Sequence, residues 1–431
     1  MTHFDTIVMG GGIGGLAVAA MLGRAGQRVL LLERAGVLGG RADTTEVEGG
    51  YLLNLGGHAL YRTGHGARVL GALGVRVRGG RPSRGPRPQG LWQGEAVALP
   101  VGAGAAFGAE GWSWGDRWEV GRGVAAAVAT GGRGQEGLPL ARWIDARFER
   151  PRARALFEAL ARVSTYANAP ERSSAGATLA QVRQALVGDV LYLDGGWRTI
   201  VRGLEEAARG AGVEIRLGAA ARRLEGEGRR WSVAWDEGEG SAEAAVLAGP
   251  PSMARGLLGA GRLGAALDGL VPIQAACLDV ALDGLPRPEG GLLLGLDAPL
   301  YASVHSGAAA LAPEGGGVIH AMKYLAPGEV TEPGADIEAL ESLLDVAQPG
   351  WRGRVVHRRA LPRMTVAGAH ALAERGGLAG RPSVEIEGIE GVFLVGDWVG
   401  DRGMLADASL ASAERAAEAI LARSRAVCRV A

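Results

Sequence analysis

The chain has 431 residues, which is too long for one ordinary domain and predicts two. Hydrophobic residues make up 47% and charged residues 21%, a balance that argues against a disordered chain. Basic and acidic residues number 46 each, so the charge does not indicate a nucleic-acid partner.

The N-terminal segment has the pattern of a βαβ unit. Two short apolar runs, 5–9 and 29–32, are predicted as buried strands. A glycine-rich turn over 10–15 and an Ala/Leu-rich helix over 16–25 separate them. This order within about thirty residues is typical of a parallel sheet.

The turn matches the dinucleotide-binding pattern GxGxxG. Gly10 allows a tight turn, Gly12 lets the backbone approach a pyrophosphate, and Gly15 lets the helix pack closely on the strand. Glu33 follows the second strand, where a carboxylate accepts hydrogen bonds from an adenosine ribose. The motif predicts a bound dinucleotide, and on this motif alone NAD and FAD both remain open.

Farther along the chain, helical and strand patterns alternate between turns rich in glycine and proline. Residues 79–88 are predicted as a loop and 91–99 as a hairpin, and 312–317 as a turn between two antiparallel strands. Predicted helices cover 143–167, 178–187, 338–346 and 405–422, with one more ending near Gly210, and predicted strands cover 213–217, 230–235, 244–248, 277–282, 301–306, 318–324 and 392–395.

A second motif, Leu38-Gly-Gly-Arg41, favours FAD. It follows the ribose acid and resembles the second FAD fingerprint of the phytoene desaturase/amine oxidase superfamily. Gly39 and Gly40 would expose backbone N–H groups beside the pyrophosphate, and Arg41 would add positive charge there.

Further segments carry the same resemblance, among them Asn54-Leu-Gly-Gly-His58 and Val392-Phe-Leu-Val-Gly-Asp-Trp398. In the superfamily the first lies against the isoalloxazine ring and the second contacts the ribityl chain or pyrophosphate. The resemblance also places the start of the last helix near the N1/O2 edge of the flavin. The cofactor-binding residues it implies are Gly10, Gly12, Gly14, Gly15, Glu33, Arg34, Gly39, Gly40, Arg41, Gly56, Gly57, Gly396, Asp397, Met404 and Leu405.

The fold class expected is α/β, with a Rossmann-like parallel sheet assembled from discontinuous segments. The FAD-binding domain is predicted over residues 1–66, 190–250 and 380–431. A substrate-binding domain of antiparallel sheet and helices is predicted over 67–189 and 251–379.

The two cysteines, Cys277 and Cys428, are predicted as free thiols, because they are far apart and form no CxxC motif. Covalent flavin attachment in some amine oxidases uses a Cys near the C-terminal motif. Cys428 lies well past that motif here, so FAD is expected to bind non-covalently. No metal site is predicted.

Two residues are the catalytic candidates. His58 follows the flavin-cradling glycines, and its alternative role is a structural hydrogen bond to a neighbouring loop. Lys323 is the single lysine of the sequence, and some relatives keep a lysine near flavin N5; its alternative is a surface position. His305 and His320 are expected to be ordinary cross-strand neighbours.

The resemblance implies an FAD-dependent oxidoreductase that acts on an apolar, isoprenoid-like or other lipidic substrate by desaturation, isomerisation or saturation. A flavin amine oxidase is the second hypothesis, weakened because Gly403-Met404-Leu405 lacks the aromatic residue of an amine cage. The third is a non-catalytic lipid-binding protein of the same fold.

The Arg- and Gly-rich composition is typical of a GC-rich bacterial genome. No uninterrupted apolar run is long enough for a transmembrane helix, and the apolar start lacks the basic residues of a signal peptide. A cytoplasmic protein is therefore expected. Trp112, Trp114 and Trp118 are expected to pack in the core or on a helix, and a substrate-stacking site or a membrane-facing rim are their alternatives.

Overall fold

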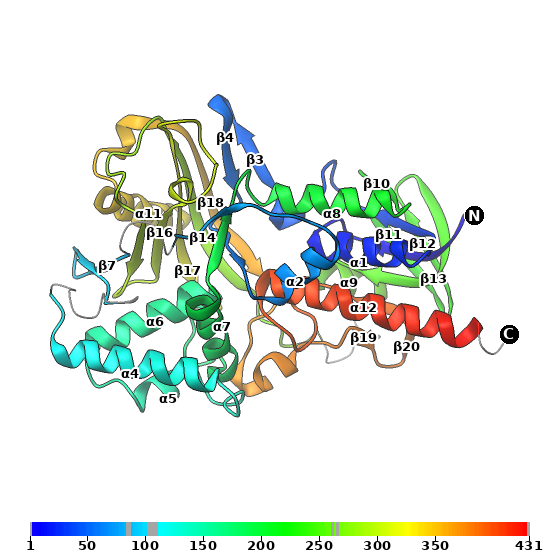
Figure 1. Ribbon diagram of the computed structural model, residues 1–431. Coiled ribbons are helices and arrows are strands. Elements are labelled where there is room, and N and C mark those ends of the chain that lie inside the picture. Colours follow the sequence, from blue (N-terminus) through cyan, green and yellow to red (C-terminus); the bar gives the residue numbers. More distant parts are fainter. Residues whose placement is uncertain (1, 83–87, 101–110, 260–262, 264–266, 429–431) are drawn as a thin grey trace.

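The structure is a computed structural model that describes residues 2–82, 88–100, 111–259, 263 and 267–428, with side chains to residue 425. It confirms the predicted α/β class, with one sheet that contains parallel strands and several antiparallel sheets. In Figure 1 the first sheet lies on the right with both termini, and the second sheet lies at the upper left.

The first sheet has eight strands in the order β10-β2-β1-β13-β12-β11, and β20 and β19 continue from the C-terminal half of β13. The pairs among β10, β2, β1, β13 and β20 are parallel, and β11, β12 and β19 join antiparallel. Its central strands are continuous buried apolar runs, as expected where helices cover both faces. The strands are β1 (Thr2–Met9), β2 (Val29–Leu32), β10 (Glu214–Arg216), β11 (Ala221–Glu227), β12 (Arg230–Trp235), β13 (Gly238–Leu247), β19 (Glu385–Ile386) and β20 (Ile389–Leu394).

Helix α1 packs between α8 and α12, and α2 packs against α12 (Figure 1). The apolar side chains of α1 and the central strands form one core. The bounds are α1 (Ile13–Arg24), α2 (His65–Ala72), α8 (Arg198–Gly210), α9 (Pro251–Leu258) and α12 (Leu405–Cys428).

The second sheet has seven strands in the order β18-β14-β17-β16-β15-β7-β8, all antiparallel except the pair β15–β7. Helix α11 (Pro333–Ala347) covers one face, where alternate residues of β14 and β17 meet its leucines. The opposite face meets the helices of residues 114–188 and the segment after β4. The strands are β7 (Gln89–Trp92), β8 (Glu95–Ala98), β14 (Ile273–Leu282), β15 (Leu292–Gly295), β16 (Leu300–Val304), β17 (Gly317–Leu325) and β18 (Val355–Ala367).

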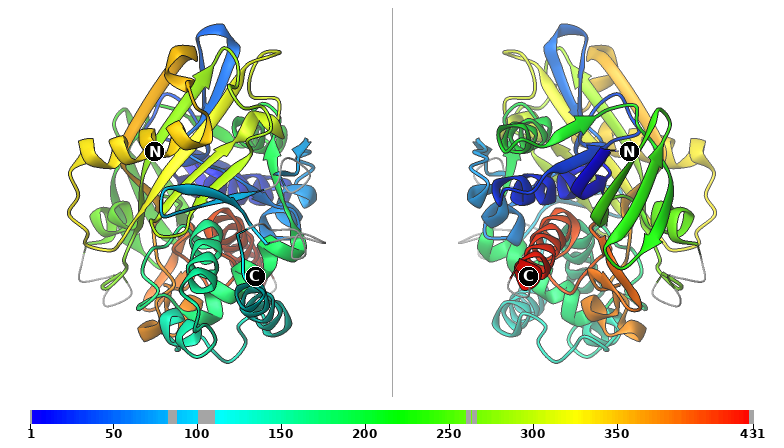
Figure 2. Two further views of the ribbon diagram at one scale, coloured as in Figure 1. Left: turned by 90° about the vertical axis from the view of Figure 1, so that its left-hand side faces the viewer. Right: turned by 90° about the vertical axis from the view of Figure 1, so that its right-hand side faces the viewer.

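A helical layer lies below the second sheet in Figure 1 and in the left view of Figure 2. It consists of α4 (Trp114–Thr130), α5 (Leu140–Asp145), α6 (Pro151–Thr165) and α7 (Ala175–Gly188). The single helix predicted over 143–167 is thus two helices, because Pro151 starts a new one at its first position.

Smaller elements connect these layers. They are the hairpin β3 (Thr44–Val47) and β4 (Tyr51–Asn54), the small sheets of β5 (Leu60–Tyr61), β9 (Val190–Leu193) and β6 (Gly79–Gly80), and the 3-10 turns η1 (Gly40–Ala42), η2 (Glu48–Gly50), η5 (His305–Gly307), η6 (Trp351–Arg354), η7 (Ala373–Arg375) and η8 (Gly377–Gly380). Residues 83–87 of the predicted loop and the side chain of Cys428 lie outside the described part of the chain.

The three tryptophans before and within α4 differ in exposure. Trp112 is buried, as predicted, but Trp114 and Trp118 are 71% and 73% exposed. They are one turn apart on the outer face of the helix, so the prediction of core packing was wrong for these two. No helix in the described ranges is long and apolar enough to span a membrane.

Candidate active site

The turn between β1 and α1 contains glycines with two different roles. Gly10 has a φ of 115°, and a Cβ there would lie 2.5 Å from the carbonyl oxygen of Ala248. A Cβ on Gly15 would overlap the carbonyl oxygen of Gly10, so packing requires both glycines. A Cβ on Gly12 would meet only the carbonyl oxygen of Gly39, at 4.0 Å. Gly12 therefore borders the open space that a pyrophosphate needs.

The N-terminus of α1 faces this same space. None of the described side chains caps the helix, and its first turn contains no acidic residue. A Cβ on Gly14 would lie 2.8 Å from the side chain of Val395, so Gly14 serves packing between α1 and the end of β20. The helix N-terminus keeps N–H groups and a positive dipole end available for an anion.

Glu33 lies directly after β2 with its carboxylate held by two backbone amides. The N–H of Gly11 donates to Oε2 at 2.7 Å, and the N–H of Ala35 donates to Oε1 at 2.8 Å. Each carboxylate oxygen can accept a further hydrogen bond, so the group is oriented for a ribose hydroxyl. The neighbouring Arg34 is exposed.

The second fingerprint lies beside the first. The N–H of Gly39 donates to the carbonyl oxygen of Gly11 at 2.9 Å. Gly39 and Gly40 have φ values of 109° and 55°, which other residues rarely adopt. A Cβ on Gly40 would meet nothing within 4 Å, so this glycine also borders open space.

Arg41 and Asp397, which are 356 residues apart, form an ion pair with Nη1 and Oδ2 separated by 2.7 Å. Arg41 also donates to the carbonyl oxygen of Val366, and the N–H of Gly368 donates to the other carboxylate oxygen of Asp397. Partial desolvation opposes the charge of Arg41, whose side chain is 46% exposed, but the carboxylate of Asp397 outweighs that penalty and raises the pKa of the guanidinium. The structure thus unites two motifs that the sequence assigned separately to the cofactor.

A strained turn leads into α12. Gly403 has a φ of 67°, and Leu405, the first residue of the helix, has a φ of 56°, unusual for a leucine. Such backbone persists only where its surroundings impose it. Met404 is buried. The N–H of Gly396 donates a hydrogen bond to the hydroxyl of Ser412 on α12 at 3.0 Å. The turn thereby fixes the direction of the α12 N-terminus.

The segment after β4 meets the second sheet on the face opposite α11. Gly56 has a φ of 76°, and a Cβ there would lie 3.1 Å from Sγ of Cys277 and 3.2 Å from Cε of Met364. A Cβ on Gly57 would lie 3.3 Å from Sδ of Met322. Sulfur and methyl groups, together with the ring of Tyr301, therefore form the sheet surface against these two glycines.

His58 is oriented by its own turn. Its Nδ1 lies 3.1 Å from the carbonyl oxygen of Gly56, and its ring meets Trp197 edge-on at 4.9 Å. Burial lowers the pKa of His58 to about 4. A carbonyl only accepts, so neutral His58 carries its proton on Nδ1 and keeps a lone pair on Nε2. That form can act as a base.

The second candidate, Lys323, lies on the face of the second sheet opposite Gly56 and Gly57. It lies on the α11 face of β17, because side chains alternate along a strand and Met322 takes the opposite face. Its Nζ lies 2.5 Å from Oδ1 of buried Asp336 and 3.6 Å from Glu329. Lys323 therefore forms a structural ion pair, and a role near flavin N5 stays a prediction.

A buried charged row crosses the second sheet on the face of Met322. Asp279 is the register partner of His320 on one side and of Arg359 on the other. His320 Nδ1 lies 2.6 Å from one carboxylate oxygen, and Arg359 donates to the other at 2.7 Å. Burial opposes ionisation of Asp279, but these two partners outweigh it and lower its pKa. Asp279 and Arg359 were not among the residues predicted from the sequence, although an acid inside an apolar strand is a usable signal.

His305 extends this row. Its ring stacks on Tyr192 at 3.8 Å and meets His320 edge-on at 4.6 Å, as expected for strand neighbours. Its Nε2 lies 3.1 Å from the hydroxyl of Tyr301, and Tyr301 lies over Gly57. Burial lowers the pKa of His305 and raises that of Tyr301, so both are neutral. Within the described residues, no group of three or more potential ligands is placed to hold a metal ion.

Solved structures of known proteins share this fold. An oxidoreductase from Methanosarcina mazei is 20% identical, with a TM-score of 0.77 over 96% of this chain and all of that one. Putrescine oxidase bound to putrescine is 16% identical, with a TM-score of 0.73 over 97% and 99%. Cyclohexylamine oxidase from Brevibacterium oxydans is 14% identical, with a TM-score of 0.71 over 98% and 99%. At these identities the likeness establishes the fold alone.

Sequence comparison adds a short match and a long one. Uncharacterized proteins of Mycobacterium bovis and Mycobacterium tuberculosis are 40% identical over 75 residues, which is 17% of this chain and only 14% of theirs. A family model described as flavin containing amine oxidoreductase matches residues 13–268, more than half of the chain. The family implies a flavin cofactor, for which the open glycine cradle and the oriented Glu33 are suited. The chain belongs to the flavin-containing amine oxidoreductase family.

Proposed function

We propose that the protein is an FAD-dependent oxidoreductase that removes hydride from an apolar, uncharged substrate. The single observation that carries the substrate class is the largely apolar surface against Gly56 and Gly57, which is formed by Cys277, Met322, Met364 and the ring of Tyr301. The carboxylate of Asp279 is already paired with Arg359 and contacts His320. An ammonium substrate would lose water there without gaining a free counter-charge.

The cofactor site fits FAD in two parts. The N-terminus of α1 and the pair of Arg41 and Asp397 are suited to the diphosphate and ribityl regions, and Glu33 is suited to the adenosine ribose. Bound FAD would supply the hydride acceptor. In this proposal His58 accepts a proton through Nε2, because its Nδ1 proton is committed to the carbonyl oxygen of Gly56.

We propose that FAD binds without a covalent bond. Cys277 is the cysteine whose side chain is described, and it lies close to Gly56. Burial raises the pKa of its thiol well above the usual value, which suppresses the thiolate needed for attachment. Acid precipitation should release all flavin colour into the supernatant, whereas colour that stays with the pellet would contradict this proposal.

The experiment for substrate class starts from the purified protein. Its organic extract should contain a copurified lipid. Under anaerobic conditions that lipid should bleach the absorption band of the bound flavin at about 450 nm. The same assay with uncharged isoprenoids should reduce the flavin at a rate that depends on their concentration. A colourless protein that stays colourless with added FAD would favour the non-catalytic lipid-binding hypothesis instead.

The second candidate function is amine oxidation, which the family match itself favours. Putrescine and cyclohexylamine are suitable test substrates, because two proteins with this fold bear those names. Oxygen consumption and peroxide formation with either amine, together with no reaction of isoprenoids, would replace the apolar-substrate proposal.

The proposal includes a peripheral membrane contact through α4. Trp114 and Trp118 are exposed on one face of this helix, and Arg117 stacks on the ring of Trp114 at 5.3 Å. Tryptophan is enriched at the membrane–water interface, and a basic residue beside it is attracted to anionic lipids. Sedimentation with anionic vesicles should capture the protein, and the double change Trp114→Ser and Trp118→Ser should abolish capture. Val330→Ser, an exposed apolar residue elsewhere, is the matched control.

A further inference from the structure

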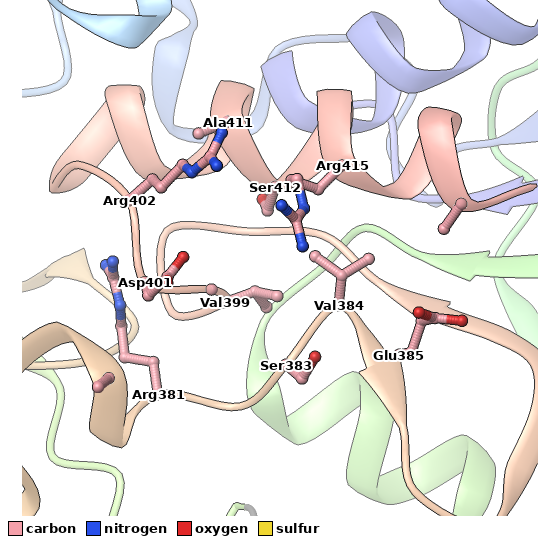
Figure 3. A pocket seen from close by; sticks show the side chains of 13 residues that line it. Arg381, Ser383, Val384, Glu385, Val399, Asp401, Arg402, Ala411, Ser412 and Arg415 are labelled. Atoms are coloured by element: carbon pink, nitrogen blue, oxygen red, sulfur yellow. The ribbon is translucent and has the colours of Figure 1, made fainter.

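A cavity of about 290 Å³ lies beneath α12, outside the glycine cradle described above (Figure 3). Its walls come from three places: the segment 379–385 before and within β19, the loop 399–402 after β20, and one face of α12. Apolar residues, including Val384 and Val399, line its middle, while three arginines stand around it. Its size is near the lower limit for small-molecule pockets.

Arg381 is the innermost of these arginines and is 7% exposed. Its guanidinium donates to the carbonyl oxygens of Asp397 and Gly403 at 3.1 and 2.8 Å. Within the described residues its Nε has no hydrogen-bond partner, and no carboxylate forms an ion pair with it. Burial lowers the pKa of Arg381 to about 10, so it is still charged at neutral pH. The carboxylates of Asp397 and Asp401 attract this buried cation without forming an ion pair with it, so its charge is only partly compensated.

Arg402 and Arg415 complete the group. Both are exposed, and Figure 3 shows Arg415 reaching from α12 toward Val384. In the described part of the chain neither forms an ion pair with a carboxylate. The cavity also contains the carboxylates of Asp401 and Glu385.

The charge around the cavity is therefore positive in sum. Three guanidinium groups face two carboxylates, and Glu385 is already paired with Arg423 outside the lining. Arginine forks match the oxygens of a phosphoryl group, and a dianion would compensate the excess better than a single carboxylate.

We propose that this cavity binds the phosphoryl group of a small soluble molecule through Arg381, Arg402 and Arg415. The ligand also acts on the segment from Asp397 to Gly403, here called the flavin loop. Arg381 holds both ends of the segment from Asp397 to Gly403, the segment that leads from the Arg41 ion pair to the first residue of α12. An anion that fixes Arg381 therefore stiffens this segment and slows release of the cofactor.

The test is calorimetric titration of inorganic pyrophosphate into FAD-saturated protein at constant ionic strength. Excess FAD keeps pyrophosphate out of the dinucleotide site. Binding in the submillimolar range is expected, and the double change Arg402→Gln and Arg415→Gln should weaken it at least about tenfold, because each removes a charged hydrogen bond. Both positions are exposed, so the variant should fold. Arg425→Gln, exposed on α12 outside the cavity, is the control.

Absence of binding up to about 10 mM pyrophosphate, weaker than any useful affinity, would overturn the site. Unchanged affinity in the double variant would place the binding elsewhere, and malonate binding as tightly as pyrophosphate would overturn the phosphoryl assignment. FAD dissociation, followed by the rise of free-flavin fluorescence, should slow at least twofold with pyrophosphate in the wild type and not in the double variant. An unchanged rate in the wild type would overturn the coupling to the flavin loop.

Discussion

The buried row around Asp279 allows a quantitative test. Asp279→Asn keeps the shape of the side chain but removes the charge that holds His320 at 2.6 Å and Arg359 at 2.7 Å. Asp279 is fully buried and Arg359 is 18% exposed, so the variant leaves a mostly buried guanidinium without its anion.

Removal of one partner from a buried pair costs about 3–5 kcal/mol. The lower end, about 3 kcal/mol, is expected here, because partial exposure and the bond from Arg359 to the carbonyl oxygen of Asn54 soften the loss. The matched control is Asp283→Asn, just past the end of the same strand. Asp283 is 62% exposed and lies 3.5 Å from Arg354, which is 53% exposed. An exposed pair of this kind is worth about 0–1 kcal/mol.

The measurement is urea unfolding of FAD-saturated protein at neutral pH, followed by tryptophan fluorescence. The loss of unfolding free energy in Asp279→Asn should be at least about three times the loss in Asp283→Asn, as the two ranges imply. Adding Arg359→Gln to Asp279→Asn should reduce the free energy of unfolding little further, because it removes the guanidinium that had lost its anion. A loss below about 1 kcal/mol for Asp279→Asn would refute the view that this row stabilises the sheet.

Four other outcomes are expected. Glu33→Ala should weaken FAD binding by about 1.5–3 kcal/mol without changing the flavin reduction rate of the reloaded protein, as measured by fluorescence titration and stopped flow; full FAD loading at nanomolar protein would contradict the ribose contact. His58→Ala should slow anaerobic flavin reduction about 10²–10⁴-fold at unchanged FAD content, and a loss under about threefold would make His58 structural. Lys323→Met should lower the melting temperature but leave flavin reduction within about threefold, because its ion pairs lie on the α11 face; a larger kinetic loss would restore it as a catalytic candidate. Burial lowers the pKa of His58 to about 4 and that of His305 well below 6.5, so the unfolded chain binds more protons and stability should fall as the pH drops from about 6.5 toward 4; a melting temperature that stays flat across this range would contradict the neutral, buried state of these rings.

Local motifs predicted the N-terminal βαβ unit of the candidate site. The order of strand, glycine turn and helix in residues 5–32 predicted β1, α1 and β2, since backbone geometry at Gly10 and Gly15 depends on near neighbours. The position of Glu33 directly after β2 was predictable for the same reason, because the end of that strand is fixed by the turn beside it. The antiparallel strands of the second sheet were also predicted, because alternation is a property of each strand alone.

Only the tertiary structure decided what lies opposite each residue. Strand register placed Asp279 between His320 and Arg359, and a shift of one residue would have turned the acid to the other face. The same two-residue period turned Lys323 toward α11, where Asp336, from a separate helix, became its partner. Arg41 and Asp397 meet because the first sheet closes with β20 from the far end of the chain. Sequence spacing carries no information about such pairs, because the contacts form between elements whose separation along the chain does not limit their distance in space.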